Sequence, residues 1–466
     1  MSANAASLPR DLKPGTAAKL AFFSAIVWFC IGTIYGGLAR IKMAYPDFLA
    51  GVPWLTFGVL RPSHVDTVIL GWITMAFAAA IYYMTPALCN TRLWNEKLAV
   101  ASIWLWNLGL VVMNATFAGG IMTGIKYHEW TWPIDMYIMF FIMVPLALNC
   151  WMTILHRKTK GIYISLWFFA ACILMIAVVF VLGSDDMGWN GIASAYMTWW
   201  YAHNVLGLWI TPVSAAIAYY TIPKVTGNPL YSHRIGHIHF WSIVGFYSTP
   251  GAHHLMAAPI PEWLKSFASV SGVLILIPAL AFVTNVLLTM EGKWHLFVEN
   301  PAIQWTLTGV LFAIPLNVQG AFQQTRAINW YIHGTNWIVA HAHMALLGFS
   351  TFVEVGAVYY ALPRLLGKPL FSVALARWHY WMTAIGFMGF WTALTASGLI
   401  EAAAKATNWS FSGMLIAEHP YMVAAVLFGW MIVVGQWLFL YNMIRTATAP
   451  VTVPEGRKAV ATAAAG

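Results

Sequence analysis

The chain has 466 residues, of which 60% are hydrophobic and only 8% are charged, and its formal net charge is +9. A soluble globular domain carries about 25% charged residues, so this composition excludes an ordinary soluble protein and places the chain in a lipid bilayer. The positive charge does not indicate nucleic-acid binding, because the basic residues fall in short segments between long apolar runs.

Twelve apolar runs follow one another along the chain, each close to the 20 or so residues that a helix needs to cross a bilayer. They lie near 19–40, 64–88, 98–120, 134–155, 162–183, 195–222, 235–259, 268–290, 302–325, 337–362, 378–400 and 420–444. Strands are excluded because the runs are too long and a membrane accepts only helices or closed barrels. We therefore predict an all-α polytopic membrane bundle of twelve transmembrane helices, forming a single domain over 1–466.

Neither the ends of the chain nor a search for repeats changes this prediction of the fold. The first run is full length and lacks a small-residue cleavage site, so we do not expect a cleaved signal peptide. No internal repeat is evident. The Ala/Thr-rich tail after about residue 446 is expected to be mobile.

The distribution of Lys and Arg predicts the orientation of the bundle. If the runs alternate in direction, most of the 24 basic residues lie on the side of the N-terminus. The opposite side holds only Arg40, Lys42, Arg61, Lys126, Lys265, Arg326 and Lys405. Both termini are therefore predicted to be cytoplasmic.

Six of the fifteen histidines fall inside the predicted spans, where ionisable residues are rare and usually functional. They are His64, His203, His253, His254, His341 and His343. Given the orientation above, all six converge on the outer half of the bilayer. A single buried histidine can be an ordinary hydrogen-bonded core residue, but six at one depth predict metal centres.

The spacing of four of these histidines has its own chemical meaning. Helical residues two apart point in nearly opposite directions, so His341 and His343 can serve two different centres on the two flanks of one helix. Adjacent His253 and His254 can reach one ion if the helix is locally distorted, which a preceding Pro-Gly pair at 250–251 permits. Three neutral imidazoles suit copper, iron or zinc.

The other nine histidines are expected to be solvated or interfacial, in or near loops and helix ends. They are His128, His156, His233, His237, His239, His295, His333, His379 and His419. Of these, His333 precedes the tenth run on the outer side and is a candidate contact for a haem propionate.

Four stretches around the six histidines resemble the ligand motifs of haem-copper oxidases. They are LRPSH (60–64), WYAHNVLG (200–207), YSTPGAHHL (247–255) and HAHMALLG (341–348). Their sequences are most similar to those of the catalytic subunit of cbb3-type cytochrome c oxidases. Three further stretches strengthen the likeness: RIGHIHFW (234–241), ALPRL (361–365) and EWTWPIDM (129–136). The resemblance covers all twelve predicted helices.

The resemblance implies a role for each matching residue. His64 and His343 are the axial ligands of a low-spin haem b, and His341 is the single protein ligand of a high-spin haem b3. A copper ion facing it is held by His203, His253 and His254. Tyr247 is the active-site tyrosine, cross-linked to His203 in this family. Arg61 pairs with a haem propionate.

The activity implied is that of a terminal respiratory oxidase, which reduces O2 to water at the haem b3–copper centre and takes up protons. The chain has no C-x-x-C-H motif for attaching a c-type haem, since Cys30, Cys89, Cys150 and Cys172 are isolated. Electrons are therefore expected from a membrane-anchored cytochrome c subunit. The expected location is a bacterial inner membrane, with the lipid bilayer and O2 (or NO) as the other partners and no nucleic acid.

Three alternatives remain at this stage. Nitric oxide reductases share the haem pair but place iron at the copper position, and they typically add a Glu four residues after the first ligand of that metal. That position is Gly207 here, which favours copper and O2. A histidine-rich transporter leaves the six histidines unexplained, and a haem-only electron carrier leaves the third metal site unexplained.

Some positions depart from the family pattern and put its usual proton route in doubt. Gln319 replaces a Glu near haem b3, Ala313 replaces a channel tyrosine, and Gly236 replaces a channel serine, whereas Thr211 is kept. Lys126 replaces an acid in the loop before EWTW, although the Glu that opens EWTW remains.

Glu354 is a further departure, because the family usually has an uncharged residue there. It follows His343 by eleven residues, about three helical turns, so it shares that face of the helix nearer the cytoplasm. One interpretation is that Glu354 pairs with Arg364 or with a polar neighbour at the inner end of the bundle. The other is that Glu354 replaces the lost proton-channel groups and passes protons toward Tyr247.

Overall fold

The computed structural model describes residues 12–184 and 187–450, and this part of the chain is helical without a β-strand. The α-helices are α1 (Thr16–Ala44), α2 (Phe57–Asp66), α3 (Met75–Cys89), α4 (Glu96–Ala118), α5 (Trp132–Ile138), α6 (Val144–Leu155), α7 (Ile164–Gly183), α8 (Gly191–Asn204), α9 (Thr211–Thr226), α10 (His233–Tyr247), α11 (Glu262–Leu274), α12 (Leu276–Thr289), α13 (Leu296–Glu299), α14 (Pro301–Gln323), α15 (Arg326–Ile332), α16 (Asn336–His343), α17 (Phe352–Leu366), α18 (Val373–Thr407) and α19 (Phe411–Thr448). The π-helical segments are η2 (Thr67–Thr74), η3 (Met139–Met143), η5 (Val205–Ile210) and η7 (Met344–Thr351), and the 3₁₀ segments are η1 (Pro53–Leu55) and η6 (Pro250–Leu255). Most of the tail that was expected to be mobile, 451–466, lies outside the described residues.

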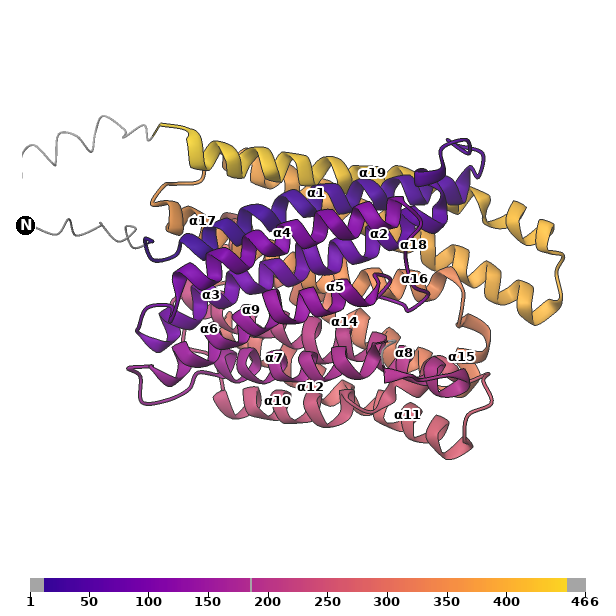
Figure 1. The fold of residues 1–466 in the computed structure, drawn as a ribbon, viewed down its shortest axis with the longest axis horizontal. Helices are drawn as coiled ribbons and strands as arrows, with labels where there is room; N and C mark the ends of the chain where they lie inside the picture. The colour runs from indigo at the N-terminus through magenta and orange to yellow at the C-terminus, as the bar shows by residue number, and fades with distance from the viewer. Residues whose placement is uncertain (1–11, 185–186, 451–466) are drawn as a thin grey trace, which may run out of the picture.

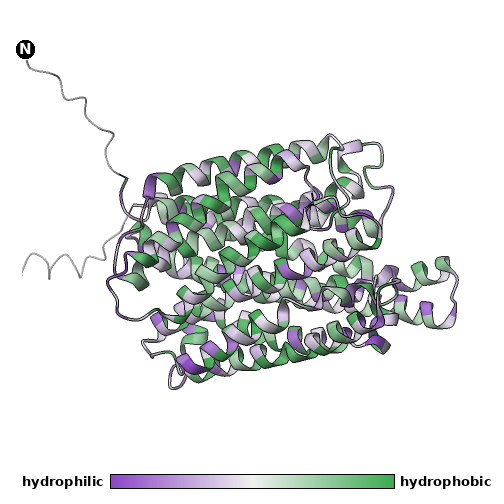
Figure 2. Cartoon of the chain, turned by 60° about the horizontal axis from the view of Figure 1, so that its bottom comes forward, coloured by the Kyte–Doolittle hydropathy of each residue, from purple (hydrophilic) through white to green (hydrophobic). Residues whose placement is uncertain are grey.

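The helices run side by side in one elongated bundle, and the start of α1 and the end of α19 lie at the same end of it (Figure 1). The sides of the helices are mostly hydrophobic, and much of the hydrophilic surface lies in the loops at the two ends (Figure 2). Within the described residues, eleven continuous helical stretches are long and apolar enough to cross a membrane. The chain is therefore an integral membrane protein, as its composition predicted.

The prediction of twelve spans is approximately right, and the difference lies in the run at 235–259. There α10 ends at Tyr247, and the chain continues as the 3₁₀ segment η6. Pro250 has no N–H to donate, and a Cβ on Gly251 would lie 2.6 Å from the Cα of Trp200. The predicted distortion before the His pair is thus present, and it shortens this span.

A five-residue motif, Tyr-Tyr-x-x-Pro, ends three of the spans. It occurs at 82–86, 219–223 and 359–363, at the ends of α3, α9 and α17. The second tyrosines of the three copies, Tyr83, Tyr220 and Tyr360, meet with ring centroids 6.0–6.3 Å apart. Each helix then stops four residues after its proline, at a residue in the left-handed conformation. The expectation that the chain has no internal repeat was therefore wrong for short motifs.

A second motif, Asn-x-x-x-Thr, also occurs three times and ties neighbouring spans together. Its copies are 149–153, 285–289 and 442–446, on α6, α12 and α19. In each copy the Asn side chain accepts from the backbone N–H of the residue that caps the facing helix (Asn95, Ser232 or Ser372), at 2.9–3.1 Å. The Thr hydroxyl accepts from the backbone N–H of the residue before that cap, at 3.0–3.1 Å. The same joint therefore connects α4 to α6, α10 to α12 and α18 to α19.

Three of the four π-helical segments begin within three residues of a predicted ligand histidine. η2 follows His64, η5 follows His203, and η7 follows His343. A π-helical turn widens the helix and is often found at functional sites. These segments lie in the half of the bundle where the six histidines meet.

Candidate metal centre

Three histidines form a compact cluster where α8 meets η6. One ring nitrogen from each of His203, His253 and His254 lies within 4.8 Å of the other two. The Nε2 atoms of His253 and His254 are 2.9 Å apart, and the Nε2 of His203 is buried without a hydrogen-bond partner. Converging imidazole nitrogens with no protein partner are suited to a single copper, iron or zinc ion. The predicted three-histidine site is therefore assembled.

Tyr247, the last residue of α10, packs directly on this cluster. Its ring centroid lies 4.5 Å from that of His203, with the ring planes 23° apart. The ring fits only because the facing residue in η5 is a glycine, since a Cβ on Gly207 would lie 1.6 Å from Cδ1 of Tyr247. A glutamate at position 207 and the tyrosine ring in this place exclude each other.

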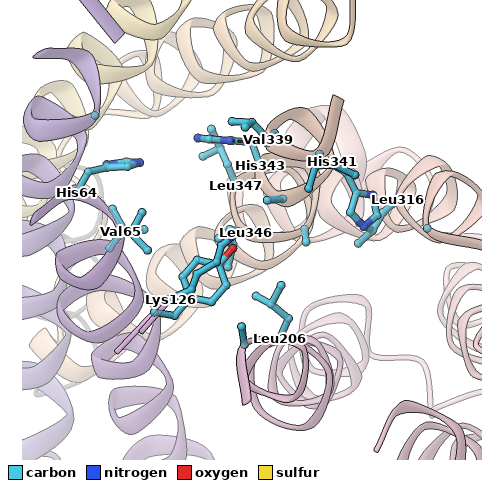
Figure 3. Close-up of a pocket in the computed structure, with 18 of the residues that line it drawn as sticks. His64, Val65, Lys126, Leu206, Leu316, Val339, His341, His343, Leu346 and Leu347 are labelled. Atoms are coloured by element: carbon cyan, nitrogen blue, oxygen red, sulfur yellow. Dashed lines mark hydrogen bonds between the residues drawn. The ribbon is translucent and has the colours of Figure 1, made fainter. Parts of the chain in front are cut away.

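His341 and His343 point to opposite flanks of α16, as their spacing predicted (Figure 3). His341 faces the three-histidine cluster, and its Nδ1 lies 3.3 Å from the side-chain oxygen of Gln319. Because the amide oxygen can only accept, Nδ1 carries the proton and Nε2 keeps its lone pair. His341 can therefore bind one metal on its own flank, with Gln319 setting the ring orientation.

On the other flank, His343 faces His64 across a gap (Figure 3). The two ring centroids are 6.3 Å apart and the planes differ by 13°. Two metal–nitrogen bonds of about 2 Å each together with half the width of each ring account for this separation. Nδ1 of His64 donates to the carbonyl of Gly32 and Nδ1 of His343 to that of Val339, both at 2.8 Å. Both Nε2 atoms are thus left free, which is the arrangement that an iron with two axial histidines requires.

One continuous cavity connects the two flanks. Its lining includes all six histidines together with Tyr247 and Thr211. Small residues leave room for the side chains of this cavity. Gly36 is one of them, because a Cβ at that position would lie 2.6 Å from the His64 ring. The lining is mostly apolar, as expected for a site that holds large planar cofactors.

Two cations stand at the outer rim of this cavity. Arg61, one turn before His64, donates to Glu129 at 2.6 Å, so the carboxylate already takes one of its five N–H groups. Lys126 lies with its Nζ 4.5 Å from the ring centroid of Trp199. Burial, with Lys126 and Lys405 nearby, lowers the pKa of His333. An acidic group entering the rim would meet two positive charges.

Some polar residues near the rim were not anticipated from the sequence. Asp66 is fully buried, and neither of its carboxylate oxygens has a partner among the described residues. Asp135 accepts from His128 and from the indole N–H of Trp130. The two acidic residues could have been singled out, because Asp66 and Asp135 each lie near the start of an apolar run, at 64–88 and 134–155.

The interpretation of three other histidines as solvated or interfacial was wrong. His128, His239 and His379 are each at most 2% exposed. His239 and His379 bond the first tyrosines of two Tyr-Tyr-x-x-Pro motifs, at 3.1 and 2.9 Å. His239 and His379 therefore have structural partners in these motifs, and His128 has one in Asp135.

Fold and site together define a class, that of an integral membrane protein built to hold haem and a third metal ion. Residues 16–431 match the family described as "Cytochrome C and Quinol oxidase polypeptide I". The chain belongs to this haem-copper oxidase subunit I family and is an oxidoreductase of respiratory electron transport. The family implies haems and copper, and the histidines described above are suited to hold both.

Individual relatives agree with this assignment. The chain is 30% identical to the "Cbb3-type cytochrome c oxidase subunit CcoN1" of Stutzerimonas stutzeri, over 91% of this chain and 93% of that protein. It is 28% identical to a "Cytochrome c oxidase subunit 1 homolog" of Agrobacterium tumefaciens, over 92% and 83%. A nitric oxide reductase subunit of Stutzerimonas stutzeri is more distant, at 24% identity over 94% and 96%. A heme-copper terminal oxidase dimer solved by cryo-EM has the same fold, with a TM-score of 0.77 and 15% identity over 94% of this chain and 85% of that one.

Proposed function

We propose that this chain is the catalytic subunit of a cbb3-like terminal oxidase, which reduces O2 to water with electrons from cytochrome c. The observation that carries this proposal is the packing of Tyr247 over Gly207 beside the three-histidine cluster. The tyrosine supplies a phenol next to the metal site. Its ring also fills the space that a carboxylate ligand for iron would need.

The cofactors proposed are one low-spin haem b, one high-spin haem b3 and one copper ion. When bound, the low-spin haem relays electrons, and the haem b3 iron and the copper together bind and reduce O2. His64 and His343 would hold the first haem through their free Nε2 atoms. His341 would hold the second haem as its one protein ligand.

The remaining residues position these groups and handle protons. His203, His253 and His254 would hold the copper ion. The Tyr247 phenol holds a proton at Oη beside this cluster and would serve as a proton donor there. Arg61 and Lys126 at the rim are placed to receive the haem propionates.

The partners and location follow from the same proposal. Electrons come from a membrane-anchored cytochrome c subunit, since no described residue offers a covalent haem attachment site. The basic loops at the end of the bundle that holds the termini predict a cytoplasmic face there. We infer a bacterial inner membrane as the location.

Nitric oxide reduction is the second candidate, because a nitric oxide reductase subunit is among the relatives. The two activities are separated by measuring turnover of the purified enzyme on O2 and on NO with the same electron donor. The proposal predicts that O2 is the preferred substrate and water the product. Turnover on NO alone would contradict it.

Tyr247→Phe tests the residue that carries the proposal. The variant keeps the ring in place over Gly207 but removes the phenol. We expect both haems to remain bound and O2 reduction to fall on the order of 10²-fold or more. In the wild type, peptide mapping should find Tyr247 joined covalently to His203. Turnover of the Phe variant at the wild-type rate would show that the phenol is not needed.

A further inference from the structure

Glu354 is the one acidic residue of α17, and its surroundings contain no charge to balance it. It is 1% exposed, and its Oε2 has no hydrogen-bond partner among the described residues. Arg364, the cation expected to pair with it, instead donates to the carbonyl of Tyr360 and lies 3.9 Å from the centroid of that ring. The expected pairing with Arg364 is therefore wrong, and the polar neighbour that Glu354 does meet is Ser350. An unpaired carboxyl group at this depth is costly and calls for another explanation.

The other carboxylate oxygen of Glu354 begins a chain of hydroxyl groups. Ser350 lies one turn earlier, at the end of the π-helical segment η7, and its Oγ is 2.6 Å from Oε1 of Glu354. The same Oγ lies 2.6 Å from Oγ of Ser214 on the neighbouring helix α9. Both serines are fully buried. Three oxygens from two helices are thus linked by two short hydrogen bonds.

The hydrogen bonds between Glu354, Ser350 and Ser214 can point in either direction. With Glu354 ionised, Ser214 donates to Ser350 and Ser350 donates to the carboxylate. With Glu354 protonated, the carboxylic acid donates to Ser350, Ser350 donates to Ser214, and Ser214 donates to the carbonyl of Ile210, which lies 2.8 Å away. Each serine hydroxyl has an acceptor for its proton in both arrangements. A proton can therefore pass by a hop across each hydrogen bond, which breaks one O–H bond and forms the next, and the hydroxyl groups then turn back.

The Ser214 end of this series of hydrogen bonds lies close to the metal cavity. Thr211 lies three residues before Ser214 on α9, so the two share a face of that helix. Thr211 lines the cavity that also contains Tyr247 and His341. Ser214 is therefore one helical turn from a threonine that lines the site.

Toward the inner end of α9, another hydroxyl group has no hydrogen-bond partner among the described residues. Thr221 lies seven residues beyond Ser214, two turns along the same face of α9. Its hydroxyl is fully buried and has no hydrogen-bond partner among the described residues. Buried polar groups of this kind usually bond an ordered water. Like the free Oε2 of Glu354, this hydroxyl offers a polar position where an ordered water can bind.

We propose that Glu354, with Ser350 and Ser214, forms a proton-delivery route from the inner face of the membrane to the metal cavity, ending at Thr211. The inference rests on the proposed oxidase function, which consumes protons in the cavity. Ala313 and Gly236 carry no exchangeable side-chain proton, so they cannot provide this route. Glu354 takes a proton from water on the inner side and releases it to Ser350 as an O–H bond forms there. Each hydroxyl passes on one proton for the one it receives, and no electrons move along the chain.

Glu354→Gln is the primary test, because it keeps the size and one acceptor but cannot release a proton. We expect turnover on O2 and proton uptake after O2 is added to the reduced enzyme to fall together, on the order of 10²-fold. Haem content, CO binding and the rate at which the low-spin haem is reduced should stay at wild-type values. Glu354→Asp, which keeps an acid, should recover part of the turnover.

Glu418→Gln is the matched control. Glu418 is also buried, at 3% exposed, and accepts from the Ser397 hydroxyl at 2.9 Å, but it belongs to α19. This variant should turn over at close to the wild-type rate. A similar loss in both variants would show a general effect of altering a buried acid and would overturn the proposal.

If Glu354→Gln fails to bind haem, Ser350→Ala tests the same proton route at a different residue. It leaves the carboxyl in place but breaks the link to Ser214, so turnover and proton uptake should again fall with haem content unchanged. Wild-type turnover in either haem-containing variant would overturn the proton route. A wild-type enzyme that binds the cofactors yet does not reduce O2 would instead contradict the proposed function, which separates the two failures.

Discussion

At the level of single residues, the position of the Tyr247 phenol depends on residue 207 being a glycine. A side chain as small as a methyl group at position 207 would overlap the tyrosine ring, because its Cβ would come within 1.6 Å of it. The choice of glycine here is therefore a requirement for placing a phenol beside the three-histidine cluster.

Gly207→Ala should displace the Tyr247 ring without removing any proposed metal ligand. We expect both haems to be retained and O2 turnover to fall on the order of 10²-fold, since a shift of about 1 Å in a reacting group has that effect. Haem spectra and O2 consumption measured on the same sample check this.

Gly245→Ala is the control for that substitution. Gly245 lies two residues before Tyr247 in α10, and a Cβ there would have no neighbour within 4 Å. If the two alanine variants lose activity equally, the steric argument at Gly207 is wrong.

At the level of helices, the three Asn-x-x-x-Thr joints hold pairs of neighbouring spans at one end of the bundle. The amides of Asn285 and Asn442 also donate to the carbonyls of Ser232 and Ser372, each at 2.9 Å. Each of these two Asn side chains therefore satisfies both a backbone donor and a backbone acceptor of the helix that it faces. Such groups have no water to replace them inside a membrane protein.

Asn442→Ala should destabilise the protein by about 1–3 kcal/mol, because it leaves the partly buried backbone N–H and carbonyl of Ser372 without their partner. Asn285→Ala should behave similarly, since its contacts are equivalent. Thermal unfolding of the detergent-solubilised protein measures both. Thr407→Ala serves as the control, because that exposed hydroxyl bonds only the carbonyl of Ala403 in its own helix. Unfolding temperatures of the Asn variants equal to that of the control would contradict the structural role of the joints.

The helical class, most spans and the meeting of the six histidines could be predicted from the sequence, because hydropathy and helical spacing are local properties. The opposite directions of His341 and His343 follow from a rotation of about 100° per residue alone. The short motifs were missed because Tyr-Tyr-x-x-Pro and Asn-x-x-x-Thr repeat over too few residues to stand out. The break after Tyr247 could be anticipated from Pro250, but its extent depends on how closely Gly251 approaches Trp200.

Contacts between distant segments could not be predicted in the same way. Arg364 was a reasonable partner for Glu354 by distance along α17, yet its guanidinium packs on Tyr360 instead. The link from Glu354 through Ser350 to Ser214 joins residues 136 positions apart at its second step. Only the packing of α9 against α17 brings these hydroxyls together.

At the level of the whole molecule, the positions of the loops predict which surface faces the cytoplasm. The short segment between α6 and α7 should lie on the inner side, together with the start of α1 and the end of α19. The turn between α18 and α19 should lie on the outer side, where the cavity and its two cations are found. All four native cysteines are buried, so an introduced cysteine can be labelled selectively.

Lys160→Cys and Ser412→Cys, both at exposed positions, test this orientation. In intact cells a membrane-impermeant thiol reagent should label the cysteine at 412, and it should label the one at 160 only after the membrane is opened. The reverse pattern would invert the topology and place the proton route on the opposite face.

Cofactor analysis of the purified protein tests the central claim most directly. The proposed sites predict two non-covalent b haems and one copper ion per chain, with CO binding to one haem only in the reduced protein. His343→Ala should remove the low-spin spectrum and leave CO binding, whereas His341→Ala should do the reverse. One haem per chain, or haem without copper, would contradict the assignment of the six histidines to three metal sites.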